Sequence, residues 1–377
     1  MIVRARHYGT GELIDIHWQH GLIVVLENAK LETPADLQTD WMAPALFDLQ
    51  INGCLGQSFN SPDLAESGIR EVIRECADHG ISGFCPTLVT NSFAALHHAL
   101  TTIRRACEVD AALNHAMSAI HLEGPWLSPE DGPRGAHPRE HVRPPNWDEF
   151  CRLQEAAGGL IRLVTLAPEL EGGLEIIERL VNSGVVVALG HTAATSLRIR
   201  DAIKAGARLS THLGNGSHAV LPRHDNYFWE QLAADELWAS IICDGFHLPR
   251  NLVRCILRVK TPQRTILTCD AGSLAGLPPG RYREWGQELE VVPEGKIVLP
   301  GTSYLAGSWS FTDACISWLT ATGEVPLHDA IDMATLQPRA LLGLPLPRLE
   351  AGCRTDLMLF DWSPETGMKV VKTLIGP

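Results

Sequence analysis

The feature that most constrains the fold of this chain is a unit that recurs eight times along its 377 residues. Each unit has a short apolar run followed by a cluster of glycine and polar residues. In several units a longer segment follows, with apolar residues near the helical period, as in 67–79, 196–205 and 250–259. The apolar runs are 44–49, 80–89, 118–122, 160–166, 184–189, 207–213, 238–243 and 265–269.

Apolar runs that alternate with helical segments are typical of a parallel sheet whose two faces are both covered. Eight such units predict an α/β protein built as a (β/α)8 TIM-type barrel. An open, doubly wound sheet is the alternative. It is disfavoured because no Gly-x-Gly-x-x-Gly motif follows the first run.

The two ends of the chain have a different character. Short runs of strand type occupy 13–18 and 21–26 near the beginning, and 356–360 and 368–374 near the end. We therefore expect a small β-sandwich domain built from both termini, residues 1–45 and 347–377, beside a catalytic barrel over residues 46–346.

Composition and charge disfavour several classes of partner and location. The net charge of -13, with no basic stripe to offset it, argues against a nucleic-acid partner. The first 18 residues contain no continuous apolar segment of signal-peptide length, and no run in the sequence approaches the roughly 18 residues that span a bilayer, so we expect no membrane partner. Its 10 cysteines are scattered and form no Cys-x-x-Cys pair, which predicts reduced thiols in a cytoplasmic protein.

A barrel enzyme carries its catalytic groups at the carboxyl ends of the strands. Glu123, His191 and His212 stand at the ends of the third, fifth and sixth runs. One carboxylate and two imidazoles can hold a divalent metal and leave a fourth position open for water. A single histidine in such a place is more often a buried structural residue, but the three together favour a metal site.

Asp270 ends the eighth run and would face the same mouth of the barrel. A carboxylate beside a metal-bound water can take its proton and pass it to a leaving amine. Without the ligand set, a helix cap or an ion-pair partner would be the better interpretation of Asp270.

Sequence spacing alone does not assign a role to several loop residues. His137 lies in the long loop after the third run and has no role that its position assigns. Arg223 and His247 either bind an anionic group of a substrate or are ordinary surface residues. Asn215 and Gly216 offer amide or backbone donors, which is a weak signal.

Longer motifs resemble those of the N-acetylglucosamine-6-phosphate deacetylase family of the amidohydrolase superfamily. The resemblance covers nearly the whole barrel and the closing β-segment. The matching segments are HLEGPWLSPEDGPRGAHP (121–138), GHTAAT (190–195), THLGN (211–215), CDGFH (243–247), CDAGSLAGLPPGRY (269–282), LAGSWSFTDA (305–314), MATLQPRALLGL (333–344) and LEAGCRTDLMLFD (349–361).

The resemblance implies a homodimeric barrel enzyme that hydrolyses the acetamide of a 6-phosphorylated amino sugar to acetate and the free amine. It implies that Asp270 is the general base and acid, and that His137 binds the substrate and polarises its carbonyl. By position in the family motifs, the metal ligands are Glu123, His191 and His212. The substrate-binding residues are Asn215 and Gly216 as the backbone-contacting pair, with Arg223 and His247 as the phosphate pair, part of which the family takes from the neighbouring subunit.

One departure from the superfamily pattern bears on the metal, although some deacetylases share it, and two departures from the family pattern bear on the substrate. Most amidohydrolases carry His-x-His at the first strand end, where this chain has Gln50-Ile51-Asn52. Neutral amides are poor ligands for a zinc-type ion, so we expect one divalent ion per subunit, zinc first, with iron, manganese or cobalt as alternatives. The usual Asn-Ala-Met is Asn-Gly-Ser at 215–217, and Arg-Glu-Pro-Gly is Arg-His-Asp-Asn at 223–226.

Two other functions therefore remain as alternatives. One is an amidohydrolase that acts on a different N-acyl compound or on a cyclic amide. The other is a barrel that binds a sugar phosphate as a sensor without hydrolysing it, which the presence of all three ligands and Asp270 disfavours.

Overall fold

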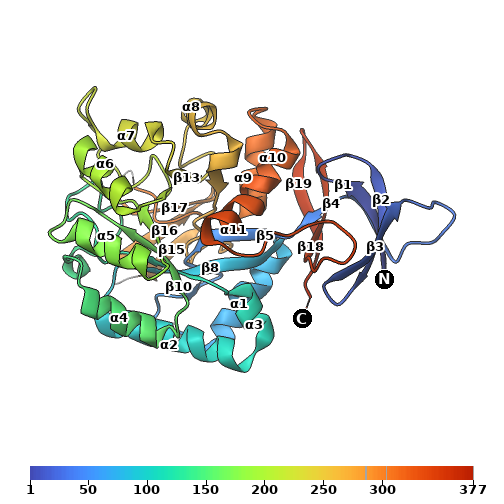
Figure 1. Ribbon diagram of the computed structural model, residues 1–377, viewed down its shortest axis with the longest axis horizontal. Helices are drawn as coiled ribbons and strands as arrows, with labels where there is room; N and C mark the ends of the chain where they lie inside the picture. The colour runs from blue at the N-terminus through green and yellow to red at the C-terminus, as the bar shows by residue number, and fades with distance from the viewer. Residues whose placement is uncertain (285–286, 303, 377) are drawn as a thin grey trace.

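The structure is a computed structural model that describes residues 1–284, 287–302 and 304–376. Its centre is an eight-stranded parallel sheet in the order β14-β13-β12-β11-β10-β9-β8-β5 (Figure 1). The strands are β5 (Leu46–Ile51), β8 (Ile81–Val89), β9 (Ile120–Glu123), β10 (Ile161–Leu166), β11 (Val186–Leu189), β12 (Leu209–Ser210), β13 (Trp238–Ile241) and β14 (Thr265–Leu267). Each predicted apolar run overlaps one of these strands, and the predicted (β/α)8 barrel is confirmed.

Helices surround the barrel, and the last of them, α11, packs against one end of it (Figure 1). They are α1 (Glu66–Asp78), α2 (Phe93–Val109), α3 (Ala111–Ala116), α4 (Trp147–Ala156), α5 (Gly173–Asn182), α6 (Ser196–Ala205), α7 (Tyr227–Ala233), α8 (Arg250–Lys260), α9 (Thr312–Ala321), α10 (Leu327–Met333) and α11 (Leu336–Leu342). The sequence sets the ends of α6 clearly. Thr195 caps its first turn by accepting from the Arg198 N–H at 3.2 Å, and Gly206 ends it in the left-handed conformation. No helix in the described part of the chain is long and apolar enough to cross a membrane.

The interior of the barrel is filled at the end opposite the carboxyl ends of the strands. Phe47, Leu163, Ala188 and Ile266 pack there against Leu342 of α11. The barrel is therefore a packed core rather than a pore, which leaves only the other end for a binding cavity.

The barrel closes between its first and last strands. Ile51 of β5 forms a parallel bridge with Ala271, which follows β14. The backbone N–H of Asn52 donates to the carbonyl of Ala271 at 2.9 Å. This pairing brings the residues after β5 beside those after β14.

A buried carboxylate reinforces this closure. Asp48 of β5 has no exposed surface. It accepts hydrogen bonds from the backbone N–H of Cys269 at 2.9 Å, from the Thr312 hydroxyl at 2.6 Å and from the Thr268 hydroxyl. A fourth bond, from the Gln50 N–H at 2.8 Å, holds its own strand end. Asp48 thus ties β5 to β14 and to the start of α9.

Strands from both ends of the chain share one sheet beside the barrel (Figure 1). Its order is β19-β18-β4-β1-β2-β3, from β1 (Ile2–His7), β2 (Leu13–Gln19), β3 (Leu22–Asn28), β4 (Leu37–Pro44), β18 (Leu357–Ser363) and β19 (Gly367–Leu374). In place of two packed sheets there is one six-stranded sheet, because β4 pairs with β1 on one side and β18 on the other. The domain boundaries at 45 and 347 stay a prediction.

An insertion after β14 was not predicted from the apolar runs. It forms an antiparallel sheet of β15 (Gly280–Glu284), β16 (Gln287–Val292) and β17 (Lys296–Val298). Its strands are half-exposed and rich in charged residues, so they lack the continuous apolar character of the barrel strands. Beside β5 there is also a small hairpin of β6 (Gly53–Cys54) and β7 (Gln57–Ser58).

Asp48→Ala is expected to lower the free energy of unfolding by about 3 kcal/mol or more, because four buried donors would lose their acceptor. Urea denaturation followed by circular dichroism measures this change. Asp78→Ala removes an exposed carboxylate from the end of α1 and should change the same quantity by less than about 0.5 kcal/mol. Equal effects of the two substitutions would contradict the role of Asp48 in closing the barrel.

Candidate active site

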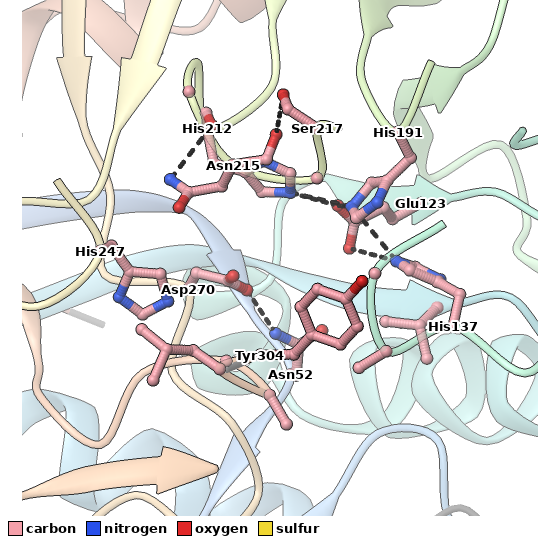
Figure 2. A pocket seen from close by; sticks show the side chains of 18 of the residues that line it. Asn52, Glu123, His137, His191, His212, Asn215, Ser217, His247, Asp270 and Tyr304 are labelled. Carbon is pink, nitrogen blue, oxygen red and sulfur yellow. Dashed lines mark hydrogen bonds and ion pairs between the residues drawn. The ribbon is translucent and has the colours of Figure 1, made fainter. Parts of the chain in front are cut away.

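A cavity of about 540 Å³ opens at the carboxyl ends of the barrel strands (Figure 2). Every predicted site residue lines it except Arg223. The lining residues that carry polar side chains are Asn52, Glu123, His137, His191, His212, Asn215, Ser217, His247, Asp270, Lys296 and Tyr304.

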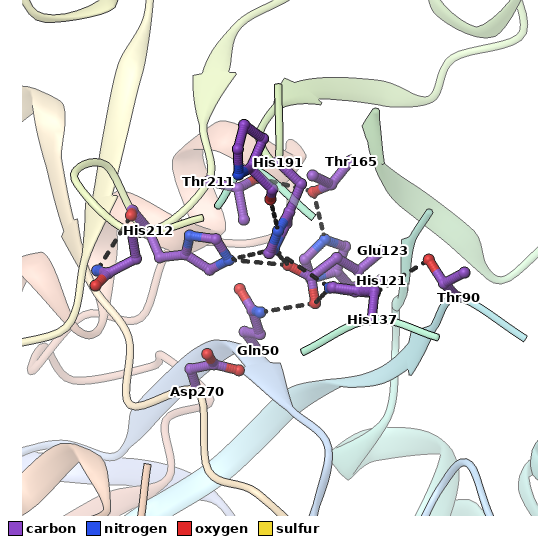
Figure 3. A network of polar contacts seen from close by, with 12 residues as sticks. Gln50, Thr90, His121, Glu123, His137, Thr165, His191, Thr211, His212 and Asp270 are labelled. Carbon is purple, nitrogen blue, oxygen red and sulfur yellow. Dashed lines mark hydrogen bonds and ion pairs between the residues drawn. The ribbon is translucent and has the colours of Figure 1, made fainter. Parts of the chain in front are cut away.

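Three buried side chains converge on one point of this cavity (Figure 3). Glu123 Oε1 lies 3.2 Å from His191 Nε2 and 3.0 Å from His212 Nε2. The two imidazole nitrogens are 3.1 Å apart. One carboxylate oxygen and two ring nitrogens at this spacing form a donor set suited to a divalent cation of the zinc type.

The ring orientation of His191 supports this fit. Its Nδ1 lies 2.8 Å from the carbonyl oxygen of Pro133, which can only accept, so Nδ1 carries the proton. The Nε2 lone pair is then available to a cation held between it and Glu123, as in metal sites where a second group orients the ligand ring. Glu169 accepts hydrogen bonds from the two residues that follow His191, from the Thr192 hydroxyl and the Ala193 N–H, both at 2.6 Å. These bonds hold the loop that carries His191.

Three residues of the site have a left-handed backbone. The φ angles are 52° at His191, 29° at His212 and 54° at Asp270. This conformation costs residues other than glycine about 1 kcal/mol or more and occurs preferentially at functional sites. In each case the residue follows the end of a barrel strand.

Gly216 packs directly against the His191 ring. It has a φ of 55°, and a Cβ there would lie 2.7 Å from His191 Nδ1. An alanine at this position would require this loop or the ring to shift. The glycine at 216 therefore lets the loop after β12 pack closely against a candidate metal ligand.

The two amide side chains after the first strand donate to carboxylates of the site. Gln50 Nε2 donates to Glu123 Oε2 at 3.1 Å, and Asn52 Nδ2 donates to Asp270 Oδ1 at 2.7 Å. Both donors are buried. The sequence indicated that this pair is poorly suited to bind metal. It did not indicate that the pair orients a candidate ligand and the candidate base.

Burial dominates the charge state of two further groups. It raises the pKa of Asp270 to about 8, and the nearby charge of Glu123 adds to this shift. A divalent cation at the cluster would oppose it, since positive charge stabilises the carboxylate. Burial also lowers the pKa of His137 to about 3, so its imidazole is neutral. His137 Nδ1 lies 3.0 Å from the Thr90 hydroxyl, and its Nε2 lies 3.3 Å from His191 Nε2.

The residues predicted to bind an anionic group of the substrate are only partly brought together. His247 lines it, with Nδ1 held at 2.7 Å by the carboxylate of Asp244. Asn215 and Gly216 line it from the loop after β12. Arg223 is exposed and lies outside the lining of this cavity, so within one chain it is not brought together with His247.

The fold and site define the class of this protein, a barrel hydrolase whose catalytic centre is suited to a divalent cation. A curated relative, the N-acetylglucosamine-6-phosphate deacetylase of Bos taurus, is 36% identical over 338 residues, which are 85% of this chain and 79% of that protein. This chain therefore belongs to the N-acetylglucosamine-6-phosphate deacetylase family.

Other relatives agree on the family and differ in the sugar. The N-acetylgalactosamine-6-phosphate deacetylase of Escherichia coli O157:H7 is 31% identical over 370 residues, 96% of this chain and 95% of that protein. Among solved structures, an N-acetyl-D-glucosamine-6-phosphate deacetylase mutant of Mycobacterium smegmatis in complex with N-acetyl-D-glucosamine-6-phosphate has a TM-score of 0.88 at 29% identity, covering 100% of this chain and 98% of that one. No protein-family model matches the chain.

Metal-stripped protein dialysed against excess zinc is expected to retain about one equivalent per chain, because one carboxylate and two imidazoles make one mononuclear set. Inductively coupled plasma mass spectrometry measures it. His191→Ala should lose this zinc. The matched control, His137→Ala, removes an imidazole from the same cavity and should keep it. Two equivalents in the unsubstituted protein, or equal loss in both variants, would contradict the assignment.

Proposed function

We propose that this chain hydrolyses the acetamide of N-acetylglucosamine 6-phosphate to acetate and the free amine. The observation that carries the proposal is the convergence of Glu123, His191 and His212 beside Asp270 in one cavity. Its relatives of 36% and 35% identity carry the name of this activity.

Glu123, His191 and His212 would hold one divalent cation, with zinc as the first expectation and iron, manganese or cobalt as alternatives. When bound, such an ion polarises the amide oxygen and lowers the pKa of water. Gln50 holds the second oxygen of Glu123, which leaves Oε1 directed at the two imidazoles.

Asp270 is the proposed general base and then general acid. Asn52 occupies its Oδ1, so Oδ2 remains to take the proton of the attacking water. The same carboxyl group then returns this proton to the amine as the tetrahedral intermediate collapses. Burial favours the protonated form of Asp270, and this form is the proton donor in the second step.

His137 is the proposed donor to the developing oxyanion. When the Thr90 hydroxyl donates to Nδ1, the ring carries its proton on Nε2, which lies 3.3 Å from Nε2 of His191. A neutral imidazole in this tautomer donates a hydrogen bond without adding charge to the site.

Asn215, Gly216 and His247 are the proposed contacts of the sugar phosphate. Arg223 would serve the cavity of a neighbouring subunit, because it is exposed and lies outside its own. The same surface exposes Val220 by 87% and Trp229 by 50% of their areas, which supports a homodimer contact here. All 10 cysteines are free, which supports a cytoplasmic location.

N-acetylgalactosamine 6-phosphate is the second candidate substrate. The relative with that name aligns with 96% of this chain, and the altered loop lies against the cavity at 214–217. The two sugars differ in the configuration of one hydroxyl group, so a change in a lining loop can alter which of them is preferred.

Acetate release from the zinc-loaded protein separates these candidates. N-acetylglucosamine 6-phosphate is expected to give the highest kcat/KM, followed by N-acetylgalactosamine 6-phosphate, with unphosphorylated N-acetylglucosamine far below. Asp270→Asn should lower kcat by about 10³-fold with metal retained, since a general base contributes about 10²- to 10⁴-fold. Asp78→Asn is the control. Tight binding of the sugar phosphate without any acetate release would support the sensor instead.

Asn52→Ala is expected to lower kcat by about tenfold or more while KM and metal content change little. Its amide touches Asp270 but no candidate metal ligand, so its loss frees the Asp270 carboxylate to rotate. Steady-state kinetics measure kcat and KM separately, and metal analysis measures the metal content. Asn114→Ala, at an exposed position on α3, should leave all three values unchanged. A change confined to KM or metal content would contradict a positioning role.

A further inference from the structure

The insertion after β14 places a positively charged side chain, that of Lys296, in the lining of the cavity. Lys296 is the first residue of β17 and lines the cavity. Its neighbour Ile297 is 1% exposed and packs with Leu289 and Val291 of β16. Because successive side chains of a strand point to opposite faces, burial of Ile297 on one face directs Lys296 to the other.

Lys296 differs in charge from the other ionised residues described in this lining. Among the described residues that form the cavity it is the only lysine or arginine, whereas Glu123 and Asp270 are acidic. Throughout residues 1–284, 287–302 and 304–376, no carboxylate lies within ion-pair distance of its Nζ. An ammonium group without a carboxylate partner, in a protein of net charge -13, is available to a ligand anion.

A second candidate for anion binding, His247, lies next in the chain to a residue that Lys296 contacts. Its Nζ lies 5.2 Å from the centre of the Phe246 ring, and Phe246 immediately precedes His247. Asp244 holds Nδ1 of His247, so Nε2 is left without a hydrogen-bond partner among the described residues. An ammonium and an imidazole on the same side of a cavity can together hold a phosphate.

We propose that Lys296 is a substrate-binding residue that holds the phosphate of the substrate within the same chain, together with His247. This inference rests on the proposed function and adds to it a specificity-determining residue. Arg223 would reach the phosphate only from another subunit, whereas β17 places Lys296 at the cavity of its own chain.

The test compares Lys296→Met with Lys296→Arg and with Lys372→Met. The last removes an equal charge from an exposed position of β19 and controls for net charge. For Lys296→Met, kcat/KM for N-acetylglucosamine 6-phosphate should fall about 10- to 100-fold, mainly through KM, as loss of one charged hydrogen bond predicts. For the unphosphorylated sugar the fall should be less than about twofold. Lys296→Arg should keep most of the activity, because it keeps the charge.

Two results would overturn the proposal: equal losses for both sugars, which would mean a structural role, or no loss for the phosphorylated sugar. Binding of glucose 6-phosphate and of glucose, measured by calorimetry, tests Lys296 without turnover. If the unsubstituted protein releases no acetate, the proposed function fails. Lys296 is then still supported if Lys296→Met, and not Lys372→Met, weakens glucose 6-phosphate alone. Equal affinities of Lys296→Met and Lys372→Met for glucose 6-phosphate would refute the role of Lys296.

Discussion

The closure of the barrel is the constraint on which the site depends. Asp270 follows the last strand, and it meets Asn52 only because the backbone of Asn52 pairs with Ala271 across the seam. The buried carboxylate of Asp48 strengthens this seam through four hydrogen bonds. A sheet left open at this point would keep Glu123 near His191 but would separate them from the proposed base.

The site also stores strain that the barrel compensates. His191, His212 and Asp270 all leave their strands through a left-handed backbone, which unfolded chains rarely adopt. Strand pairing on both sides and the packed interior below them restrict any relaxation. One layer deeper, His121 and Thr211 both contact the hydroxyl of Thr165 at 2.7 Å, which gives the cluster a rigid polar floor (Figure 3). Rigid support of this kind keeps donor atoms in place before a cation or substrate arrives.

Two properties of the barrel could be predicted from the sequence: the burial of its strands on both faces, and their common direction. The eight barrel strands are mostly apolar and largely buried, and parallel strands end on the same side, so Glu123 and His191 could be placed together from their positions at strand ends. The half-exposed insertion carries no such pattern, and Lys296 was missed with it. The donor roles of Gln50 and Asn52 depend on side-chain geometry across the seam, which spacing does not encode. For Arg223, residue type indicated charge but not on which side of a subunit it lies.

Anomalous diffraction at the zinc edge, from crystals of the Asp270→Asn variant soaked with N-acetylglucosamine 6-phosphate, tests the central claim most directly. The account predicts one anomalous peak per chain, bonded to Glu123, His191 and His212, with the acetamide of the sugar beside residue 270. A second peak at Gln50 and Asn52, or a peak bonded to other residues, would contradict it. So would a sugar bound with its acetamide away from the metal.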